Sequence, residues 1–379
     1  MGLETVVTDK DPAAPGLKLA DHAEVVDTLD LEGMLRVGRK HRVDGVIAEQ
    51  TDIAVPPAAY VAEQMGLPGI GYETALAATN KWLMRERCRA AGVAGPRYRK
   101  AATLDEARAA AEEIGLPVVI KPVDAQASRG VAKISDVQDI SQWFEKTRAH
   151  SREGLVLIEE MMTGTESSAE AFVVGDNIEV LGICDKTKCS PPYSFDTRLI
   201  YPAAFPSAVL EEIKSLNERV VRAVGVRMGI THAEYVVTDA GVRLIEVAAR
   251  GCGAGVATRL IPAMTGVDLV GARIRQALGV DDALGERTLQ KSGILEFLLL
   301  PHGRVKKIAG LSEARQIAGV IDIGLNVRQG DAIGIVESGD QRHGHLLAVA
   351  ETRVRLLEII EEVRQTLEIE MESPPMTSS

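Results

Sequence analysis

The chain has 379 residues, of which 46% are hydrophobic and 26% are charged, and its mean hydropathy is +0.03. This length is enough for two or three packed domains, and the composition is not that of a disordered chain. The net charge of −11 and the pI near 5.3 argue against nucleic acid as a partner, and the 3% aromatic content argues against base-stacking platforms.

No apolar run approaches the length of a membrane span, and the start "MGLETVVTDKD" lacks the basic region and apolar core of a signal peptide. The four cysteines form no C-x-x-C pair and show no zinc-like spacing. We therefore expect reduced thiols, a cytoplasmic location and no membrane partner.

Residues 1–75 alternate between β-branched runs and helical spacing, which predicts an α/β domain. Strands are predicted at "ETVVTD" (4–9) and "VDGVIAE" (43–49). A helix is predicted at "VPPAAYVAEQMG" (55–66), and the chain is expected to return to the sheet at "LPGIG" (67–71).

Residues 76–285 predict a larger domain, in which Thr103 and Glu106 have the spacing of a helix capping box. Its predicted elements are helices at 79–93 and 103–115, strands at 117–123 and 131–134, a helix near 136–149, strands at 155–161, 167–175 and 177–188, a helix at 207–225 and a hairpin at 231–250. Residues 286–379 predict a β-rich domain, with a helix near 353–367 that closes the fold and a frayed tail at 371–379.

The turn signal "TDAG" joins the two strands of the hairpin. A three-residue loop of Asp239, Ala240 and Gly241, with Gly241 at positive φ, is a common hairpin form. It places Glu234 directly opposite Glu246, with their Cβ atoms about 5 Å apart. Two like charges there repel by roughly 3 kcal/mol at an effective dielectric of about 20, which indicates a bound cation or one protonated carboxylate.

Mg²⁺ fits this pair because it usually takes one or two carboxylates and completes its shell with water and phosphate oxygens. The pair thus indicates a site for Mg²⁺ that carries a nucleotide. The alternative is a register one residue off, which would leave the two acids as solvated side chains on opposite faces.

The same register places His232 opposite Ala248 and Ile230 opposite Arg250. Arg250 then shares a face with Glu246, where a guanidinium can hold a carboxylate or a transferring phosphoryl group through paired bonds. Taken alone, Arg250 fits a surface salt bridge equally well.

Charged residues also end two apolar strands upstream. Lys121 ends "VVIK", where a lysine is uncommon unless its amine reaches an anion. Glu159 and Glu160 end "LVLIEEM", and Glu166 follows; these acids could bind adenine and ribose, or form a solvated strand end. The loop "DAQASRG" (124–130) could close over phosphates through backbone N–H groups, although a plain surface turn explains it as well.

The order of these features resembles the ATP-grasp superfamily. The features are a lysine in the 79–93 helix, the lysine of the "IKP" strand, the small-residue loop, an "EE…G-x-E" hinge, and then Glu…Glu-x-x-x-Arg. More narrowly it is similar to ATP-dependent carboxylate–amine ligases of the L-amino acid (dipeptide) ligase type. The resemblance covers about residues 4–367. It implies an α/β fold (α+β overall) with a short Rossmann-like N-terminal domain, a mobile lid lobe at about 115–175 and the β-rich C-terminal domain.

The resemblance also assigns roles to individual residues. It implies Arg250 and Lys121 as catalytic residues, Glu234 and Glu246 as ligands of Mg²⁺ or alternatively Mn²⁺, and His232, Lys186 and Arg250 as substrate-side residues. The implied ATP-binding residues are Lys81, Lys121, Ser128, Gly130, Glu159, Glu160, Met162 and Glu166. Lys188 is a further anion contact in the same stretch as Lys186.

Two features depart from the family pattern. The family often carries an asparagine at the position of Ala248, so the metal shell has one protein oxygen fewer. Relatives also begin with a strand and a glycine-rich turn that the segment 1–75 lacks.

The implied reaction activates a carboxylate, that of an amino acid, as an acyl phosphate and joins it to an amine. Small-molecule substrates and a homodimer are expected. The alternatives are transfer of the acyl group to a carrier thiol or a purine-pathway amine, and a non-catalytic nucleotide-binding protein with a degraded metal site.

Overall fold

The computed structural model describes residues 2–280 and 284–372. The N-terminal segment contains one two-stranded parallel sheet, of β1 (Val6–Asp9) and β2 (His22–Val25). Its other elements are α1 (Leu31–His41), α2 (Val55–Met65), α3 (Tyr72–Thr79) and the 3-10 turns η1 (Pro15–Lys18) and η2 (Asp52–Ala54). The predicted strand at 4–9 and helix at 55–66 are confirmed.

Two predicted strands of this segment are wrong, because residues 43–49 and 67–71 join no sheet. Gly45 packs against the end of helix α9 (Leu269–Ala277), so closely that a Cβ would lie 2.9 Å from the carbonyl oxygen of Ala277. β-Branched residues favour a strand only where a neighbouring strand completes the ladder, and here a helix occupies that position. Residues 67–71 form a short connection between α2 and α3.

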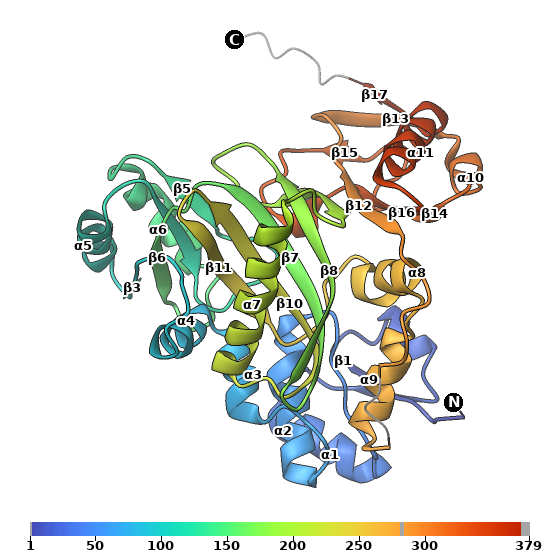
Figure 1. The fold of residues 1–379 in the computed structure, drawn as a ribbon, viewed down its shortest axis with the longest axis horizontal. Helices are drawn as coiled ribbons and strands as arrows, with labels where there is room; N and C mark the ends of the chain where they lie inside the picture. Colours follow the sequence, from blue (N-terminus) through green and yellow to red (C-terminus); the bar gives the residue numbers. More distant parts are fainter. Residues whose placement is uncertain (1, 281–283, 373–379) are drawn as a thin grey trace.

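A four-stranded antiparallel sheet, at the left of Figure 1, has the order β3-β6-β4-β5, and we call it the lid sheet. It consists of β3 (Tyr98–Ala101), β4 (Val118–Pro122), β5 (Ala132–Ile134) and β6 (Val156–Glu160), with α5 (Leu104–Ile114) and α6 (Asp139–Arg148) packed on it. The capping box is confirmed, since Thr103 Oγ1 accepts from the Glu106 N–H and the Glu106 carboxylate accepts from the Thr103 N–H, each at 3.3 Å.

The central element is an eight-stranded sheet of order β11-β10-β7-β8-β9-β12-β16-β14. Its strands are β7 (Thr165–Val174), β8 (Asn177–Lys188), β9 (Asp196–Tyr201), β10 (Met228–Thr238), β11 (Gly241–Ala248), β12 (Ser292–Leu298), β14 (Val320–Leu325) and β16 (Gly344–Ala350).

Helices cover both faces of this sheet, as the alternation of side chains along β7 requires. Ala171 and Val173 pack against α4 (Lys81–Ala90) and α7 (Ser207–Val224), whereas Phe172 packs on the opposite face. That opposite face is covered by the π-turn η3 (Val256–Leu260) and α8 (Ile261–Thr265), together with α9. The sheet is therefore a buried platform, and charged side chains within its strands, such as Glu170 and Glu296, are buried with partners.

The C-terminal region adds β12, β14 and β16 to the large sheet and forms a three-stranded sheet of order β15-β13-β17. Its remaining elements are β13 (Gly303–Ala309), α10 (Leu311–Ala314), β15 (Ala332–Ile333), the 3-10 turn η4 (Gly339–Gln341), α11 (Arg353–Thr366) and β17 (Glu368–Glu372). The predicted closing helix is α11, but β17 follows it and pairs with β13.

The predicted tail at 371–379 is therefore wrong for Met371 and Glu372, which belong to β17. Residues 373–379 lie outside the described residues. The mixed α/β class and the β-rich C-terminal region are confirmed, whereas the boundaries expected near residues 75 and 285 stay predictions. Among the described helices, none has the length and apolar character needed to cross a bilayer.

Candidate active site

The hairpin of β10 and β11 brings the two predicted metal ligands together. Glu234 is the cross-strand partner of Glu246, and His232 is the partner of Ala248, as predicted. Gly241 has a φ of 104°, also as predicted. The alternative register, with the two acids on opposite faces, is thereby excluded.

The route to this register differs from the prediction in two ways that cancel. Thr238 pairs with Gly241, so the loop has two residues rather than three. A β-bulge then places Ile245 between the pairs Tyr235–Leu244 and Glu234–Glu246, which shifts the register back by one residue. The predicted pair of Ile230 and Arg250 is wrong, because β11 ends at Ala248.

Arg85 of α4 holds the bulge in place. Its Nη2 donates to the Ile245 carbonyl oxygen at 2.5 Å and its Nη1 to that of Leu244 at 3.2 Å. The same guanidinium binds Glu159 of the lid sheet at 2.7 and 3.2 Å, and Lys121 Nζ lies 2.5 Å from the Glu159 carboxylate. Arg85 thus ties the hairpin to the lid sheet inside the protein.

Glu159 is almost fully buried in this cluster, so it is not a solvated strand end. Burial alone would raise the pKa of its carboxyl group, but the charges of Arg85 and Lys121 lower that pKa to about 2. Burial also lowers the pKa of the Lys121 ammonium, against the attraction of Glu159. Lys121 therefore reaches an anion, as the sequence predicted, and this anion is part of the protein.

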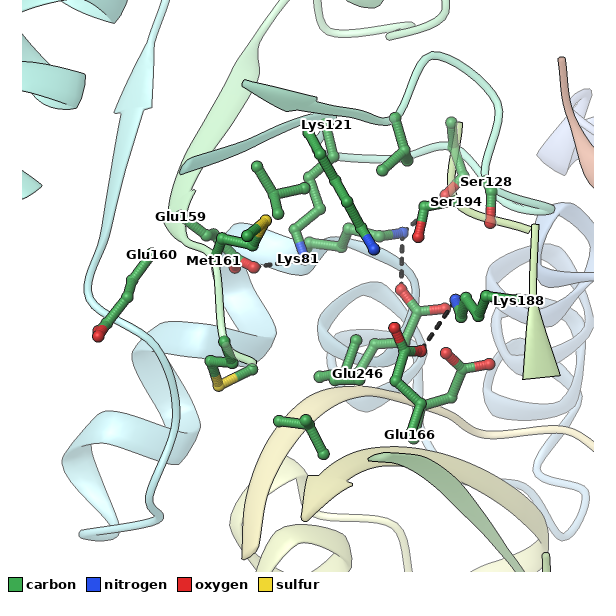
Figure 2. A pocket seen from close by; sticks show the side chains of 18 of the residues that line it. Lys81, Lys121, Ser128, Glu159, Glu160, Met161, Glu166, Lys188, Ser194 and Glu246 are labelled. Carbon is green, nitrogen blue, oxygen red and sulfur yellow. Dashed lines mark hydrogen bonds and ion pairs between the residues drawn. The ribbon is translucent and has the colours of Figure 1, made fainter. Parts of the chain in front are cut away.

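A cleft lies between the lid sheet and the hairpin, and Figure 2 shows its lining. The predicted residues that line it are Lys81, Lys121, Ser128, Glu159, Glu160, Met162, Glu166, Glu234 and Glu246. Gly130, Lys186, His232 and Arg250 do not line it. In Figure 2, Lys81 and Lys121 point toward the cleft from one side, and Glu246 and Glu166 face them from the other.

Lys81, at the first position of α4, joins three parts of the cleft. Its Nζ donates to the carbonyl oxygen of Ala125 at 2.7 Å and lies 3.3 Å from Glu246 Oε2. Burial opposes the charge of this ammonium, but Glu246 and Asp52 raise its pKa. Lys81 is therefore a charged amine placed between the small-residue loop and the hairpin.

Glu234 is held in its ionised form by a second set of cations. Lys186 Nζ lies 2.6 Å from Glu234 Oε1 and 2.9 Å from Asp196 Oδ2, and His232 Nε2 lies 3.2 Å from Glu234 Oε1. Burial acts to raise the pKa of Glu234, but Lys186 and His232 hold it well below its ordinary value. The network continues through Lys188, whose Nζ lies 2.9 Å from Glu166 and 3.5 Å from Asp196.

His232 contacts two carboxylates, those of Glu170 and Glu234. Its Nδ1 lies 2.5 Å from the buried carboxylate of Glu170, which is its cross-strand partner on β7. Burial would lower the pKa of His232, but Glu170 raises it well above its ordinary value. Ala248 is buried and offers no oxygen, so Glu234 and Glu246 are the carboxylates that this hairpin presents to the cleft.

The small-residue loop at 124–130 is anchored on two sides, so it is not a plain surface turn. Gln126 Oε1 accepts from the Asp52 N–H at 2.8 Å, and its side chain bonds to Thr51 Oγ1. On the other side, Gly339 N–H donates to the Ala127 carbonyl oxygen at 3.0 Å. Ser128 has a φ of 57°, in the left-handed region, and lines the cleft.

Gly130 has a φ of 68° and packs against His150 instead of the cleft, because a Cβ there would lie 2.8 Å from His150 Cδ2. Arg250 is also directed elsewhere. Its Nε donates to Asp52 Oδ1 at 2.6 Å and its Nη1 to the Gly251 carbonyl oxygen at 2.9 Å. This pair is largely buried, so Arg250 does not form a surface salt bridge.

Sequence reasoning missed Arg85, Gln126, Asp52 and Asp196. Arg85 had a detectable signal, since it shares the buried stripe of α4 with Met84 and Cys88, where an arginine requires a partner. Gln126 and Asp52 had none, because their partners lie 74 to 198 residues away in the sequence.

Comparisons with known proteins agree with this architecture. Residues 114–259 match the ATP-grasp domain, and residues 296–372 match the L-amino acid ligase C-terminal domain 2. The uncharacterized protein y4rH of Sinorhizobium fredii is 30% identical over 378 residues, which are 97% of this chain and 77% of that protein. The carbamoyl phosphate synthase large chain of Vibrio parahaemolyticus is 25% identical over 81% of this chain. The matched region is only 28% of that much longer protein.

Solved structures show the same fold over nearly the whole chain. The L-amino acid ligase of Bacillus licheniformis superposes with a TM-score of 0.85 at 22% identity, covering 98% of this chain and 93% of that one. Phosphoribosylglycinamide synthetase from Anaerococcus prevotii gives a TM-score of 0.76 at 18% identity, covering 98% and 94%. The chain therefore belongs to the ATP-grasp superfamily and has a C-terminal domain of the L-amino acid ligase type.

Proposed function

We propose that the protein uses ATP and Mg²⁺ to activate the carboxylate of an amino acid as an acyl phosphate, which an amine then captures to form an amide. The observation that carries this proposal is the cross-strand pair Glu234–Glu246, which faces Lys81 and Lys121 across one cleft. Two carboxylates and two ammonium groups in one cleft suit a polyphosphate that arrives with a divalent cation.

The cleft has apolar walls for the base of the nucleotide. Val119 lies on the lid-sheet side, Met162 follows β6, and Val236 and Ile245 belong to the hairpin. A flat ring can be buried between such walls, and the backbone at the end of β6 can bind its polar edge. Glu160 and Glu166 are the carboxylates proposed for adenine and ribose, while Glu159 supports the site from inside through Arg85 and Lys121.

The residues present fit a magnesium ion. Both hairpin carboxylates face the cleft, and Glu234 is held ionised, which is the form that binds a hard cation. Bound Mg²⁺ would neutralise charge on the transferring phosphoryl group and orient the phosphate oxygens. Ala248 contributes no oxygen, so water and phosphate would complete the shell.

The protein's own groups then act on the substrates. Lys81 and Lys121 are proposed to bind phosphate oxygens, with Lys81 exchanging its contact with Glu246 for the nucleotide. The substrate carboxylate oxygen attacks the γ-phosphorus, the bond to the β-phosphate oxygen breaks, and ADP leaves. The amine nitrogen then attacks the acyl carbon, loses a proton and expels phosphate. The anchored loop at 124–130 excludes water, which would otherwise hydrolyse the acyl phosphate.

Arg250 is proposed to meet the substrate carboxylate beyond the end of β11, and Lys186 and His232 are the other residues proposed for the substrate side. Its guanidinium is oriented by Asp52 and the Gly251 carbonyl, so its fork is fixed before substrate binds. That arrangement suits stabilisation of a developing phosphoryl charge.

An ADP-release assay with amino acids supplied singly and in pairs tests this function. We expect release that requires two substrates and a stoichiometric amide product. Glu246→Gln should lower kcat/KM by more than about 100-fold with an unchanged melting temperature, because it removes a charged ligand at the partly exposed cleft floor. Glu211→Gln, on the exposed surface of α7, is the matched control and should retain activity.

Other outcomes separate the competing functions. Release that requires a carboxylate without any amide product would indicate another acceptor, such as a carrier thiol or a purine-pathway amine. Absence of ATP binding would indicate a degraded nucleotide site and end the ligase proposal. The expected homodimer stays a prediction, which sedimentation equilibrium would check.

A further inference from the structure

A carboxylate, an imidazole and a thiol meet on the face of the large sheet that η3, α8 and α9 cover. Glu170 comes from β7, His232 from β10, and Cys252 from the loop that follows β11. All three side chains are buried. One ligand atom of each, namely a carboxylate oxygen, a ring nitrogen and a sulfur, lies within 4.8 Å of the other two. Three side chains that can bind one ion thus lie together, and they are not among the residues that line the nucleotide cleft.

Hydrogen bonds orient both oxygens of the Glu170 carboxylate. Its Oε1 accepts from the Tyr201 hydroxyl at 3.2 Å and lies 2.5 Å from His232 Nδ1. Its Oε2 accepts from the Cys252 N–H at 3.3 Å. The imidazole ring and the cysteine backbone are therefore both fixed relative to one carboxylate. Outer hydrogen bonds of this kind hold the ligands of a metal site in place before the ion binds.

The two ring nitrogens of His232 have different partners. Nδ1 faces Glu170, whereas Nε2 lies 3.2 Å from Glu234 Oε1. A histidine that binds a metal through one nitrogen almost always donates its other N–H to an acceptor such as a carboxylate, which fixes the tautomer. Glu234 already occupies that outer position. The ring is therefore oriented to bind an ion on its Nδ1 side.

The donor set determines which class of ion fits. Mg²⁺ prefers oxygen ligands, whereas thiolate sulfur and imidazole nitrogen favour Zn²⁺ and related transition metals. Bonds of about 2.0–2.2 Å at tetrahedral angles place two ligand atoms about 3.3 Å apart. Glu170 Oε1 and His232 Nδ1 are now 2.5 Å apart, so they need to separate by only about 1 Å to admit the ion.

The loop that carries Cys252 is open on its outer side. Gly253 and Ala254 are partly exposed, and a Cβ at Gly253 would meet no heavy atom within 4 Å beyond its chain neighbours. Open space therefore borders the residue next to the thiol. This space gives an ion a route to the buried ligands.

We propose that Glu170, His232 and Cys252 bind a divalent cation of the zinc class, at a site separate from that of the Mg²⁺ that accompanies ATP. Cys252 gives up its thiol proton on binding, and water fills the fourth position. His232 and Cys252 lie 62 and 82 residues from Glu170 in the sequence, so no spacing motif marks the site. Because His232 also contacts Glu234, the site adjoins the carboxylate pair of the cleft.

Cobalt titration tests this site, because Co²⁺ replaces Zn²⁺ at such sites and shows a charge-transfer band when a thiolate binds it. Chelator-treated wild-type protein should bind one equivalent of Co²⁺ with this band, and Zn²⁺ should remove the band. A large excess of Mg²⁺ should leave it unchanged. Cys252→Ser should abolish the band and weaken Zn²⁺ binding by more than about 100-fold. The matched control is Cys189→Ser, which removes a partly exposed free thiol and should retain the band.

Absence of the band in the wild-type protein would overturn the proposal, and so would a band that survives Cys252→Ser or that Mg²⁺ removes. Alkylation of the wild-type protein needs no variant, so it decides the question even if Cys252→Ser does not fold. Zn²⁺ should slow iodoacetamide labelling of Cys252 by about 10-fold or more and leave that of Cys189 unchanged, as peptide mass spectrometry would measure. Equal labelling rates of Cys252 with and without Zn²⁺ would reject the site. Neither measurement uses ATP, so both are independent of the proposed ligase function.

Discussion

Two charge clusters border the cleft, and they use the same residue types at different depths. In the lid-side cluster, the side chains of Arg85, Glu159 and Lys121 are only 2–7% exposed. In the floor pair, Lys81 is 14% and Glu246 is 35% exposed, and their charged atoms are 3.3 Å apart. Desolvated charges cannot separate without a large cost, whereas partly hydrated ones can exchange partners. The lid-side cluster therefore holds the shape of the site, and the floor pair is available to ligands.

Arg85→Met should reveal the largest difference in stability between the two clusters. It leaves Lys121 as the remaining cation beside the Glu159 carboxylate and removes the guanidinium donor of the Leu244 and Ile245 carbonyl oxygens, and we expect the free energy of unfolding to fall by about 3–5 kcal/mol. Urea unfolding followed by circular dichroism measures it. Lys81→Met, the matched change in the floor pair, should lower that free energy by only about 1 kcal/mol while weakening nucleotide binding. Equal losses of stability would show that the clusters do not differ.

The second-largest expected effect is a loss of stability of the lid-side cluster at low pH. The pKa of Glu159 lies at about 2, below its ordinary value of 4.5, so its contribution to stability is complete above pH 4.5. It is lost as the pH falls from about 4.5 to about 2, and the difference corresponds to about 3 kcal/mol. Unfolding free energies measured across this range should fall more steeply for the wild type than for Glu159→Gln. Parallel curves for the two proteins would contradict the assignment.

The smallest expected effect concerns the contact between the loop at 124–130 and the N-terminal segment. Gln126→Ala removes the acceptor of the Asp52 N–H and the partner of Thr51. We expect ADP release without amide formation to rise by a few fold, with stability changed by about 1 kcal/mol, since a neutral hydrogen bond is lost near the surface. The ratio of ADP to amide measures this leak. Gln138→Ala, at an exposed turn before α6, should leave the ratio unchanged.

Most helices and strands from residue 104 to 248 could be predicted, because each carries its own periodicity and turn residues. Strands β3 and β9 were not predicted. The pairing of Glu234 with Glu246 was also predicted, but through two errors that cancelled. A loop one residue too long compensated for an unseen bulge at Ile245. Arg85, which binds the bulge, lies about 160 residues away in the sequence. Its position on the buried stripe of α4 indicates that it needs a partner, but no local pattern identifies that partner as the hairpin.

The same limit explains contacts of these residues that the sequence did not predict. Arg250 turns to Asp52, which is 198 residues away, and Gly130 packs on His150 rather than facing the cleft. Residues 43–49 have strand-like composition, but their neighbour is α9. In each case the local conformation depends on a neighbouring residue or helix that is distant in the sequence and comes close only in the folded protein.

The bulge at Ile245 also affects which insertions and deletions this hairpin can accept during evolution. The chain between Asp239 and Gly241 lies beyond the point where Arg85 clamps the bulge carbonyls, so a change of loop length there can be absorbed before it reaches Glu246. In a hairpin without such a clamp, a residue gained or lost at the tip would shift the register by one and move every later side chain of the strand to the opposite face of the sheet. The clamp thus separates a part of the strand that is free to vary by insertion and deletion from a part whose geometry the chemistry keeps fixed.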